Sequence, residues 1–517
     1  MPAERSLQSR HAVMLALLLA GVSFFLQAGV RLDMADEGLL WYGSRAVLQG
    51  LVPLRDFSVY DPGRYYWTAA VSRIFGGGLL SMRFAAWLFQ ALCLSFGFLA
   101  LARSFRSVPK LVLAAVMAML WQFWWFRFFD AGIPMIAVFF ATRLAENPNT
   151  RRHWEAGIFS GLAIFFGINH GIYVLGGFLL LMACLNSKAT RSFAAGLGIG
   201  SIPLVVMLVA VPGFWLSYRD HLIYHAGHLA RGATDFRRLI AWPWELPWHE
   251  ATAQVPHFWF KRLHFLNICA QGAAFLTLVL FYVFCAPYFL IKKENVKKMP
   301  LLAGSVFIGI FYFHHVLTRG DVGHLGEGIF PLISGACALF AMKTPRGKNA
   351  RCFLASWVVL VTLLAALPLT NLFFEVLVPK DRMRFLSVGR DTVWIPENQA
   401  FFLDRTVQMV KEIVPPGEPL LIAPMLTTLY CILDRRAPVR DIYFYQPQPE
   451  RFQEATIREL EAGKVNWVIL GDPVFDNKPE RRFSNTHPVL WGYLAAHFEA
   501  VSDDQPWPAH YLMKRKI

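Results

Sequence analysis

Three carboxylates stand close together near the start of the chain. Asp33, Asp36 and Glu37 lie in Arg31-Leu-Asp-Met-Ala-Asp-Glu-Gly38, directly after the apolar stretch 12–30. A charged group beside a membrane span is costly to keep near hydrocarbon, so such a cluster is a functional-site hypothesis by default. A carboxylate here can act as a general base towards a hydroxyl group. The alternative is that it caps the helix that follows and interacts with the helix dipole.

Basic and polar side chains elsewhere suit the binding of an anion. Arg319, Asp321 and His324 lie in one short turn between two apolar stretches, and Arg64 and Arg83 follow the carboxylates in the sequence. A guanidinium group forks onto two phosphate oxygens, so these arginines are candidates for a phosphate site. Alternatively, the turn is a solvated loop that contains a structural ion pair. The alternative for Arg64 and Arg83 is that their side chains extend to the membrane surface and bind nothing.

The histidines form a third group of candidates. His221, His225 and His228 fall on one face of a predicted helix, where imidazoles are able to share a metal ion. A polar helix face without a metal is the favoured interpretation, and a divalent cation is left open as a cofactor. His170 is a secondary candidate for the active site, and a hydrogen-bonded core histidine is the alternative reading.

The composition of the chain is that of a membrane protein. Of its 517 residues, 56% are hydrophobic and only 16% are charged, whereas about 25% are charged in soluble domains. We count about eleven apolar stretches of a length suited to cross the bilayer. They are residues 12–30, 84–102, 111–129, 131–145, 156–168, 171–186, 193–212, 265–291, 301–317, 328–342 and 353–374.

The basic residues give the predicted orientation. The net charge is +15, but the lysines and arginines gather in alternate short loops, which is the positive-inside pattern and not a nucleic-acid-binding surface. The amino terminus is therefore predicted to be cytoplasmic and the carboxy terminus to lie outside. The basic loops are near residues 5–10, 103–110, 143–152, 188–191, 292–298 and 343–351.

This orientation places the candidate residues on the outer side of the membrane. The predicted outer segments of the transmembrane part, residues 1–375, are 31–83, 213–264 and 318–327. Within the first of them, residues 38–49 and 65–75 read as two short interfacial helices around the turn Tyr60-Asp-Pro-Gly63. Such helices are suited to frame a cavity for a lipid head group.

The carboxy-terminal residues 376–517 read as a small extracytoplasmic α/β domain, because charge rises and long apolar runs disappear. Short apolar runs predict buried strands, and periodic segments predict helices. The predicted strands are 419–423, 465–470 and 510–513, and the predicted helices are 400–413, 450–462 and 488–498.

The first outer segment resembles that of the GT-C membrane glycosyltransferases. The resemblance rests on a carboxylate pair after the first span and on Tyr60-Asp-Pro-Gly-Arg-Tyr-Tyr66, with Phe75-Gly76 and Arg83. Weaker support comes from Arg319-Gly-Asp-Val-Gly-His324. The bacterial protein-mannosyltransferase and aminoarabinose-transferase group is the most similar, and the likeness in layout covers roughly residues 10–375.

The resemblance implies a polytopic α-helical enzyme of the bacterial inner membrane that takes a sugar, a hexose or a pentose, from a polyprenyl-phosphate donor. The acceptor would be a lipid, a glycan or a protein of the cell envelope. Asp36 matches the family's acidic base or metal ligand, with Glu37 beside it and Asp33 as a further candidate. The sequence has no Asp-x-Asp motif, so metal dependence is open. A transporter or flippase of lipid-linked sugars is the alternative function, but its ionisable residues would line the middle of the membrane.

Overall fold

The computed structural model describes residues 2–105, 107–122, 125–232, 258–319, 322–342, 347–367, 382–475, 479–501 and 510–516. The chain forms two compact units, and each is described separately below. The first comprises Met1–Leu26 and Ala86–Leu377, and the second comprises Gln27–Ala85 and Val378–Ile517. The second unit therefore joins the first predicted outer segment to the carboxy-terminal residues.

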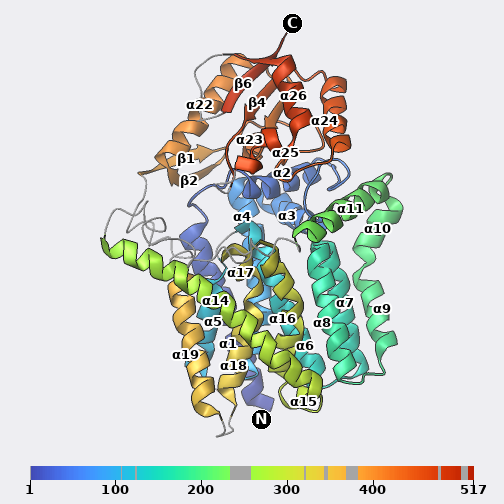
Figure 1. The fold of residues 1–517 in the computed structure, drawn as a ribbon, viewed down its shortest axis with the longest axis vertical. Helices are drawn as coiled ribbons and strands as arrows, with labels where there is room; N and C mark the ends of the chain where they lie inside the picture. Colours follow the sequence, from blue (N-terminus) through green and yellow to red (C-terminus); the bar gives the residue numbers. More distant parts are fainter. Residues whose placement is uncertain are drawn as a thin grey trace. The chain divides into compact units, whose positions relative to one another are not determined.

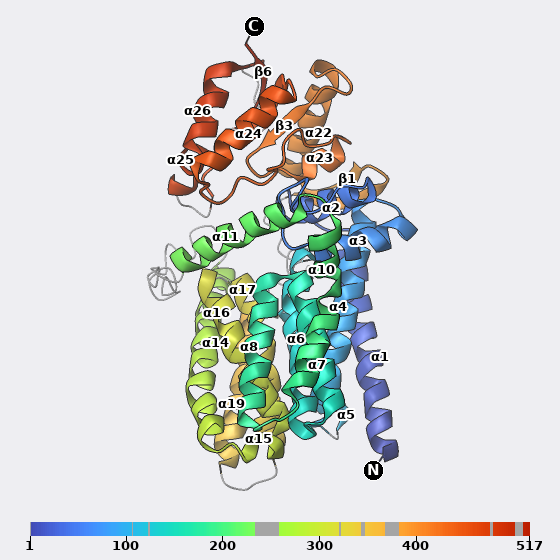
Figure 2. The same ribbon diagram turned by 90° about the vertical axis from the view of Figure 1, so that its right-hand side faces the viewer.

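The first unit is helical, and its long helices run side by side (Figures 1 and 2). It contains most of α1 (Pro2–Gln27) and of α4 (Leu79–Ala102). Its other helices are α5 (Val108–Leu120), η1 (Trp125–Arg127), α6 (Phe128–Glu146), α7 (Thr150–Phe166), α8 (Ile168–Cys184), α9 (Thr190–Gly200), α10 (Ile202–Ala210), α11 (Phe214–Gly232), α14 (Phe258–Ile291), α15 (Asn295–Lys298), α16 (Pro300–Arg319), α17 (Val322–Gly328), α18 (Phe330–Ala341) and α19 (Lys348–Ala365).

Most of the predicted apolar stretches coincide with a helix or with a bent pair of helices, whereas 111–129 covers α5, η1 and the start of α6, and the end of 353–374 lies outside the described residues. Within the described residues, however, only six helices are long and apolar enough to cross a membrane, or up to eight if each bent pair is one span. The bent pairs are α9 with α10 and α17 with α18, and each bends by 52°. Helices α5 and α8 are apolar but shorter, so the predicted count of about eleven is an upper figure.

Helices α7 and α9 approach each other backbone to backbone. Gly157 and Gly161 on α7 face Gly196 and Gly200 on α9, so both helices carry small residues at four-residue spacing. A Cβ atom on Gly200 would lie 2.0 Å from the carbonyl oxygen of Ile158. Small residues at this spacing drive helix packing inside membranes, where the hydrophobic effect does not. The pattern explains how the weakly apolar α7 is held in the unit.

The second unit contains a four-stranded sheet of order β3-β4-β6-β5. Its strands are β3 (Leu420–Ala423), β4 (Trp467–Gly471), β5 (Phe498–Ala500) and β6 (His510–Arg515). Strands β3 and β4 are parallel, and β6 runs antiparallel to both β4 and β5. Helix α22 (Glu397–Ile413) covers one face, whereas α24 (Glu450–Ala462) and α26 (Pro488–His497) cover the other (Figure 1).

The alternation of side chains along the strands explains these two layers. Leu421, Val468 and Leu470 point to the face where Leu460 of α24 and Leu490 of α26 complete a buried apolar cluster. Residues that alternate with them point to the opposite face. The unit also contains α23 (Thr428–Ile432), η3 (Pro479–Arg481) and α25 (Phe483–Thr486).

The predicted strands and helices of the carboxy-terminal domain are confirmed, with shifts of a few residues at their ends. The antiparallel hairpin of β1 (Met383–Val388) and β2 (Asp391–Pro396) was not predicted. Helices α2 (Asp36–Leu48) and α3 (Pro62–Phe75) occur at the two segments predicted as short helices, and their position at the membrane surface stays a prediction. Both belong to the second unit.

Candidate functional site

The segment that carries the three carboxylates is fixed by backbone hydrogen bonds. The residues directly before it pair with β2, since the amide of Arg31 donates to the carbonyl oxygen of Trp394 at 2.8 Å and the amide of Trp394 donates to the carbonyl oxygen of Gly29 at 2.7 Å. The side chain of Gln399 donates to the carbonyl oxygen of Leu32 at 2.7 Å. The hydroxyl of Thr428 on α23 donates to the carbonyl oxygen of Asp33 at 2.8 Å. The start of α2 is therefore held by several elements of its unit.

The close approach of α2 to α23 depends on a glycine. A Cβ atom on Gly38 would lie 2.3 Å from both the amide nitrogen and the hydroxyl oxygen of Thr428. No real Cβ contact is this short, so only glycine allows the two helices to touch here without a backbone shift. The amide of Thr428 uses this proximity and donates to the carbonyl oxygen of Met34 at 3.1 Å.

Glu37 is one half of a buried ion pair. The guanidinium of Arg83 donates to both carboxylate oxygens of Glu37, at 2.6 and 2.7 Å. Arg83 also donates to the carbonyl oxygens of Ala28 and Arg31. Arg83 is 1% exposed and Glu37 is 2% exposed. Such a bidentate pair is geometrically specific, and here it ties α4 to the segment before α2.

Asp33 caps the start of α2. Its Oδ1 atom accepts hydrogen bonds from the backbone amides of Ala35 and Glu37, at 3.0 and 3.1 Å. The capping interpretation of Asp33 therefore describes its geometry. Packing of protein around the segment, followed by the nearby charge of Asp36, raises the pKa of Asp33 to about 6, although the side chain itself is exposed to solvent.

Asp36 has a different kind of partner. Its Oδ1 atom accepts a hydrogen bond from the phenol of Tyr443 at 2.5 Å. Tyr443 follows β3 in the sequence, and burial, together with the charge of Asp36, raises its pKa well above its usual value. The phenol therefore stays protonated and donates. This pair could not be predicted from local sequence patterns, because 407 residues separate its members.

Arg64 lies buried at the start of α3, with 5% of its surface exposed. Its guanidinium carbon is 4.8 Å from the centre of the Tyr60 ring, which is a cation–π contact. Snorkelling to a membrane surface does not describe this environment. A role in phosphate binding stays a prediction.

The other candidates lie in the first unit. His170 is buried on α8, and its Nε2 atom is 2.8 Å from an oxygen of Asp130 on α6. Its Nδ1 atom is 3.2 Å from the hydroxyl of Tyr312 on α16. His324 is buried on α17, with its ring 5.3 Å from that of His315. The sequence pointed to His170 and His324 but not to their partners.

Several of the predicted site residues lie outside the part of the chain that the structure describes. Asp321 lies outside the described residues, and so do the side chains of Arg319, His225 and His228. His221 is described, and its ring stacks near that of Tyr218 at 6.2 Å. The roles predicted for these residues remain predictions.

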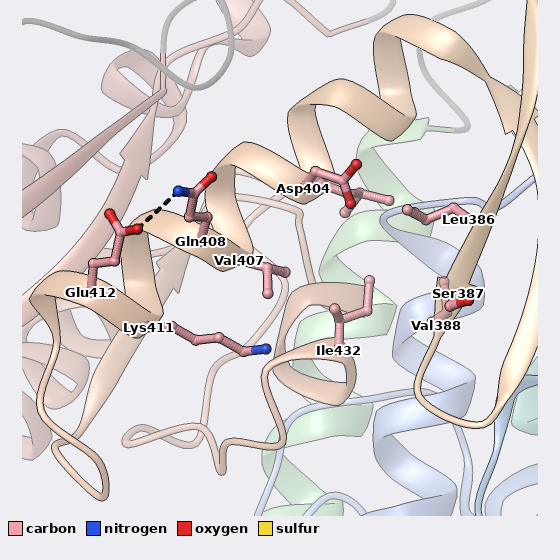
Figure 3. Close-up of a pocket in the computed structure, with 10 residues that line it drawn as sticks. Leu386, Ser387, Val388, Asp404, Val407, Gln408, Lys411, Glu412 and Ile432 are labelled. Atoms are coloured by element: carbon pink, nitrogen blue, oxygen red, sulfur yellow. Dashed lines mark hydrogen bonds between the residues drawn. The ribbon is translucent and has the colours of Figure 1, made fainter.

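A surface pocket of about 380 Å³ lies elsewhere in the second unit (Figure 3). Leu386 and Val388 of β1, Val407 of α22 and Ile432 form its apolar lining, and Lys411 is among its polar residues. None of the predicted site residues lines it.

Comparison with known proteins identifies the class of the fold. No protein-family model matches the sequence, and no significant match occurs among curated proteins. Solved structures do match over almost the full length, and they show that the chain shares their fold.

Two of the matching structures are of ArnT from Cupriavidus metallidurans. The structure bound to undecaprenyl phosphate is 14% identical, covers 97% of each chain and has a TM-score of 0.51. The apo structure is 13% identical, with coverage of 97% of this chain and 96% of that chain and a TM-score of 0.50. Identity this low establishes similarity of fold and leaves function to be argued from the residues.

Proposed function

We propose that this protein is a glycosyltransferase that moves a sugar from a polyprenyl-phosphate donor to an acceptor of the cell envelope. The ArnT-like fold supports the general class, and the ArnT structure that contains undecaprenyl phosphate supports a donor with a polyprenyl-phosphate carrier. The proposed acceptor is a lipid, a glycan or a protein that presents a hydroxyl group. The transferred sugar is a hexose or a pentose.

The arrangement of Asp36 carries the proposal. The neighbouring carboxylates have structural tasks, since Asp33 caps α2 and Glu37 pairs with Arg83. Asp36 neither caps the helix nor pairs with Arg83, and it receives the Tyr443 phenol instead. The hydrogen bond from the phenol fixes the direction of the Asp36 carboxylate. A general base must be held within hydrogen-bond reach of the proton that it removes.

The proposed reaction is a single displacement at the anomeric carbon. Asp36 removes the proton from the acceptor hydroxyl, and the oxygen forms a new bond to the anomeric carbon. The bond between that carbon and the phosphate oxygen breaks, and polyprenyl phosphate leaves with the electron pair. One displacement of this kind inverts the configuration of the sugar. Arginine side chains, with Arg64 and Arg319 as candidates, would stabilise the charge on the leaving phosphate.

The site is proposed to face the outside of the bacterial inner membrane. The six apolar helices make the chain a multi-pass membrane protein. Its basic loops follow the positive-inside pattern, which would leave the amino terminus in the cytoplasm and the 31–83 segment outside. A donor lipid would then enter the site from the outer leaflet.

A reconstituted assay separates this function from lipid transport. The purified chain is placed in vesicles that contain a labelled polyprenyl-phosphate sugar and an envelope lipid or glycan extract. A transferase releases free polyprenyl phosphate and labels the acceptor. A flippase makes the donor accessible on the other side of the vesicle and leaves its sugar–phosphate bond intact, and that result would reject the proposal.

A further inference from the structure

A second group of buried ionisable side chains lies in the first unit, apart from the carboxylates of α2 in the sequence. It consists of His315 on α16 with His324 and Glu327 on α17. The three residues are 7%, 8% and 1% exposed. One nitrogen or oxygen atom of each lies within 4.8 Å of the others. Burial of this many ionisable groups is costly unless something compensates them.

The chemistry of the three side chains is that of a transition-metal site. Two imidazoles and one carboxylate form the ligand set of many zinc sites that keep a fourth position open. Imidazole and carboxylate together favour zinc and similar divalent ions over magnesium or calcium, which prefer oxygen ligands. His324 and Glu327 are three residues apart and so project from the same side of α17.

The charges around the cluster also favour a cation. Glu327 and Asp130 are two carboxylates that both lie close to the guanidinium of Arg127. Its Nη1 atom is 3.4 Å from Glu327 and 4.0 Å from Asp130. A bound divalent ion would interact favourably with both carboxylates in a site with little solvent.

The surroundings of the cluster resemble the outer shell of a metal site. Arg127 approaches the Oε1 atom of Glu327, whereas His315 contacts its Oε2 atom. One carboxylate thus faces two partners, as ligating carboxylates commonly do. The His315 ring is also 5.2 Å from the ring of His170, which Asp130 and Tyr312 orient.

We propose that His315, His324 and Glu327 bind a divalent transition-metal ion, with zinc as the expected ion. Each residue supplies one ligand atom, and water or an anionic oxygen takes the remaining position. The ion joins α16 to α17, and Glu327 connects it to Arg127 of η1. The competing arrangement is a hydrogen-bonded His315–Glu327 pair without an ion.

The metal content of the purified protein tests the proposal. The chain is produced with an affinity tag that contains no histidine, and its metals are measured by mass spectrometry. We expect about one zinc ion per chain, and a roughly tenfold or greater loss in His324→Gln and Glu327→Gln. His314→Gln is the matched control, because His314 precedes His315 on α16, lies outside the cluster and contacts Tyr173. The control should keep its zinc.

Cobalt provides an independent measurement on the unaltered chain. Protein stripped with a chelator should bind Co²⁺ with visible absorption bands, and added zinc should abolish those bands. The stripped protein should also unfold at a lower temperature than the untreated protein. Added zinc should return the unfolding temperature to its original value. Wild-type protein that neither carries zinc nor binds cobalt would overturn the proposal, as would equal zinc content in wild type and a folded His324→Gln variant.

Discussion

Asp33, Asp36 and Glu37 are near neighbours in the sequence, yet each carboxylate has its own partner. Backbone amides hold Asp33, the Tyr443 phenol holds Asp36, and Arg83 holds Glu37. This separation of partners is the reason that one of the three is proposed as the base. Breaking a buried ion pair by removal of one partner costs about 3–5 kcal/mol. Substitution of Glu37 or Arg83 should therefore lower the free energy of unfolding, and a loss of activity in such variants would follow from the loss of stability.

Tyr443→Phe should reduce sugar transfer while Asp36 is still present. The variant loses the hydrogen bond that orients the carboxylate, and a hydrogen bond to a charged group is worth about 1.5–3 kcal/mol. The turnover rate should therefore fall by roughly tenfold or more, because each 1.4 kcal/mol is about a factor of ten in rate. Tyr445→Phe is the control, because the Tyr445 hydroxyl contacts Arg481 instead. An unchanged rate in Tyr443→Phe would remove Tyr443 from the site.

Asp33 should make the stability of the protein depend on pH. Its pKa is raised from 3.8 to about 6 in the folded chain. A raised carboxyl pKa means that the folded state favours the protonated form, so this stabilisation is complete below pH 3.8 and is lost as the pH rises through about 6. Melting temperatures should show a step in that window. Asp33→Asn keeps an oxygen for capping and should lack the step; a step of the same size in both proteins would assign it to another group.

Helix α2 and its neighbours determine where Asp36 lies. The apolar periodicity of residues 38–49 predicted this helix, and β3, β4, α22, α24 and α26 were equally visible as local patterns. The contacts that orient the helix were not visible. Thr428 and Trp394 reach it from hundreds of residues away, and a local pattern holds no information on such pairing. The β1–β2 hairpin was not predicted, because apolar and polar residues alternate only weakly along its strands. Phe385 of β1, for example, is apolar but exposed.

Gly38→Ala should disturb the contact between α2 and α23. The added methyl group would overlap the backbone of Thr428, and overpacking of this kind typically costs about 1–3 kcal/mol. Thermal unfolding should occur at a lower temperature, and transfer should decrease because Asp36 shifts. Gly492→Ala is the matched control, since a Cβ atom there meets nothing within 4 Å. If both variants unfold alike, the close approach at Gly38 is unimportant.

The chain as a whole combines apolar helices with a polar unit formed from two distant parts of the sequence. Composition and the lengths of apolar stretches predicted the membrane class, and the matching helices confirm it. The number of spans was less predictable, because bent pairs such as α17 and α18 break what reads as one apolar stretch. The assembly of residues 27–85 with 378–517 depends on long-range contacts and had no sequence signal.

The proposed orientation predicts an extracytoplasmic carboxy terminus. A phosphatase that folds only outside the cytoplasm, fused after Ile517, should be active in intact cells. The same enzyme fused in the basic loop near residues 292–298 should be inactive, because that loop is predicted to be cytoplasmic. The reverse pattern would place the carboxylates of α2 on the cytoplasmic side and contradict the proposed site.

The most direct test of the account is sugar transfer by Asp36→Asn. The change preserves the size of the side chain and leaves the capping by Asp33 intact, so the protein should fold. A general base contributes roughly 10²–10⁴-fold to a rate, and transfer should fall by about that factor. Glu397→Gln, an exposed acid in the first turn of α22, is the control and should transfer normally. Full transfer by a well-folded Asp36→Asn protein would contradict the assignment of Asp36 as the base.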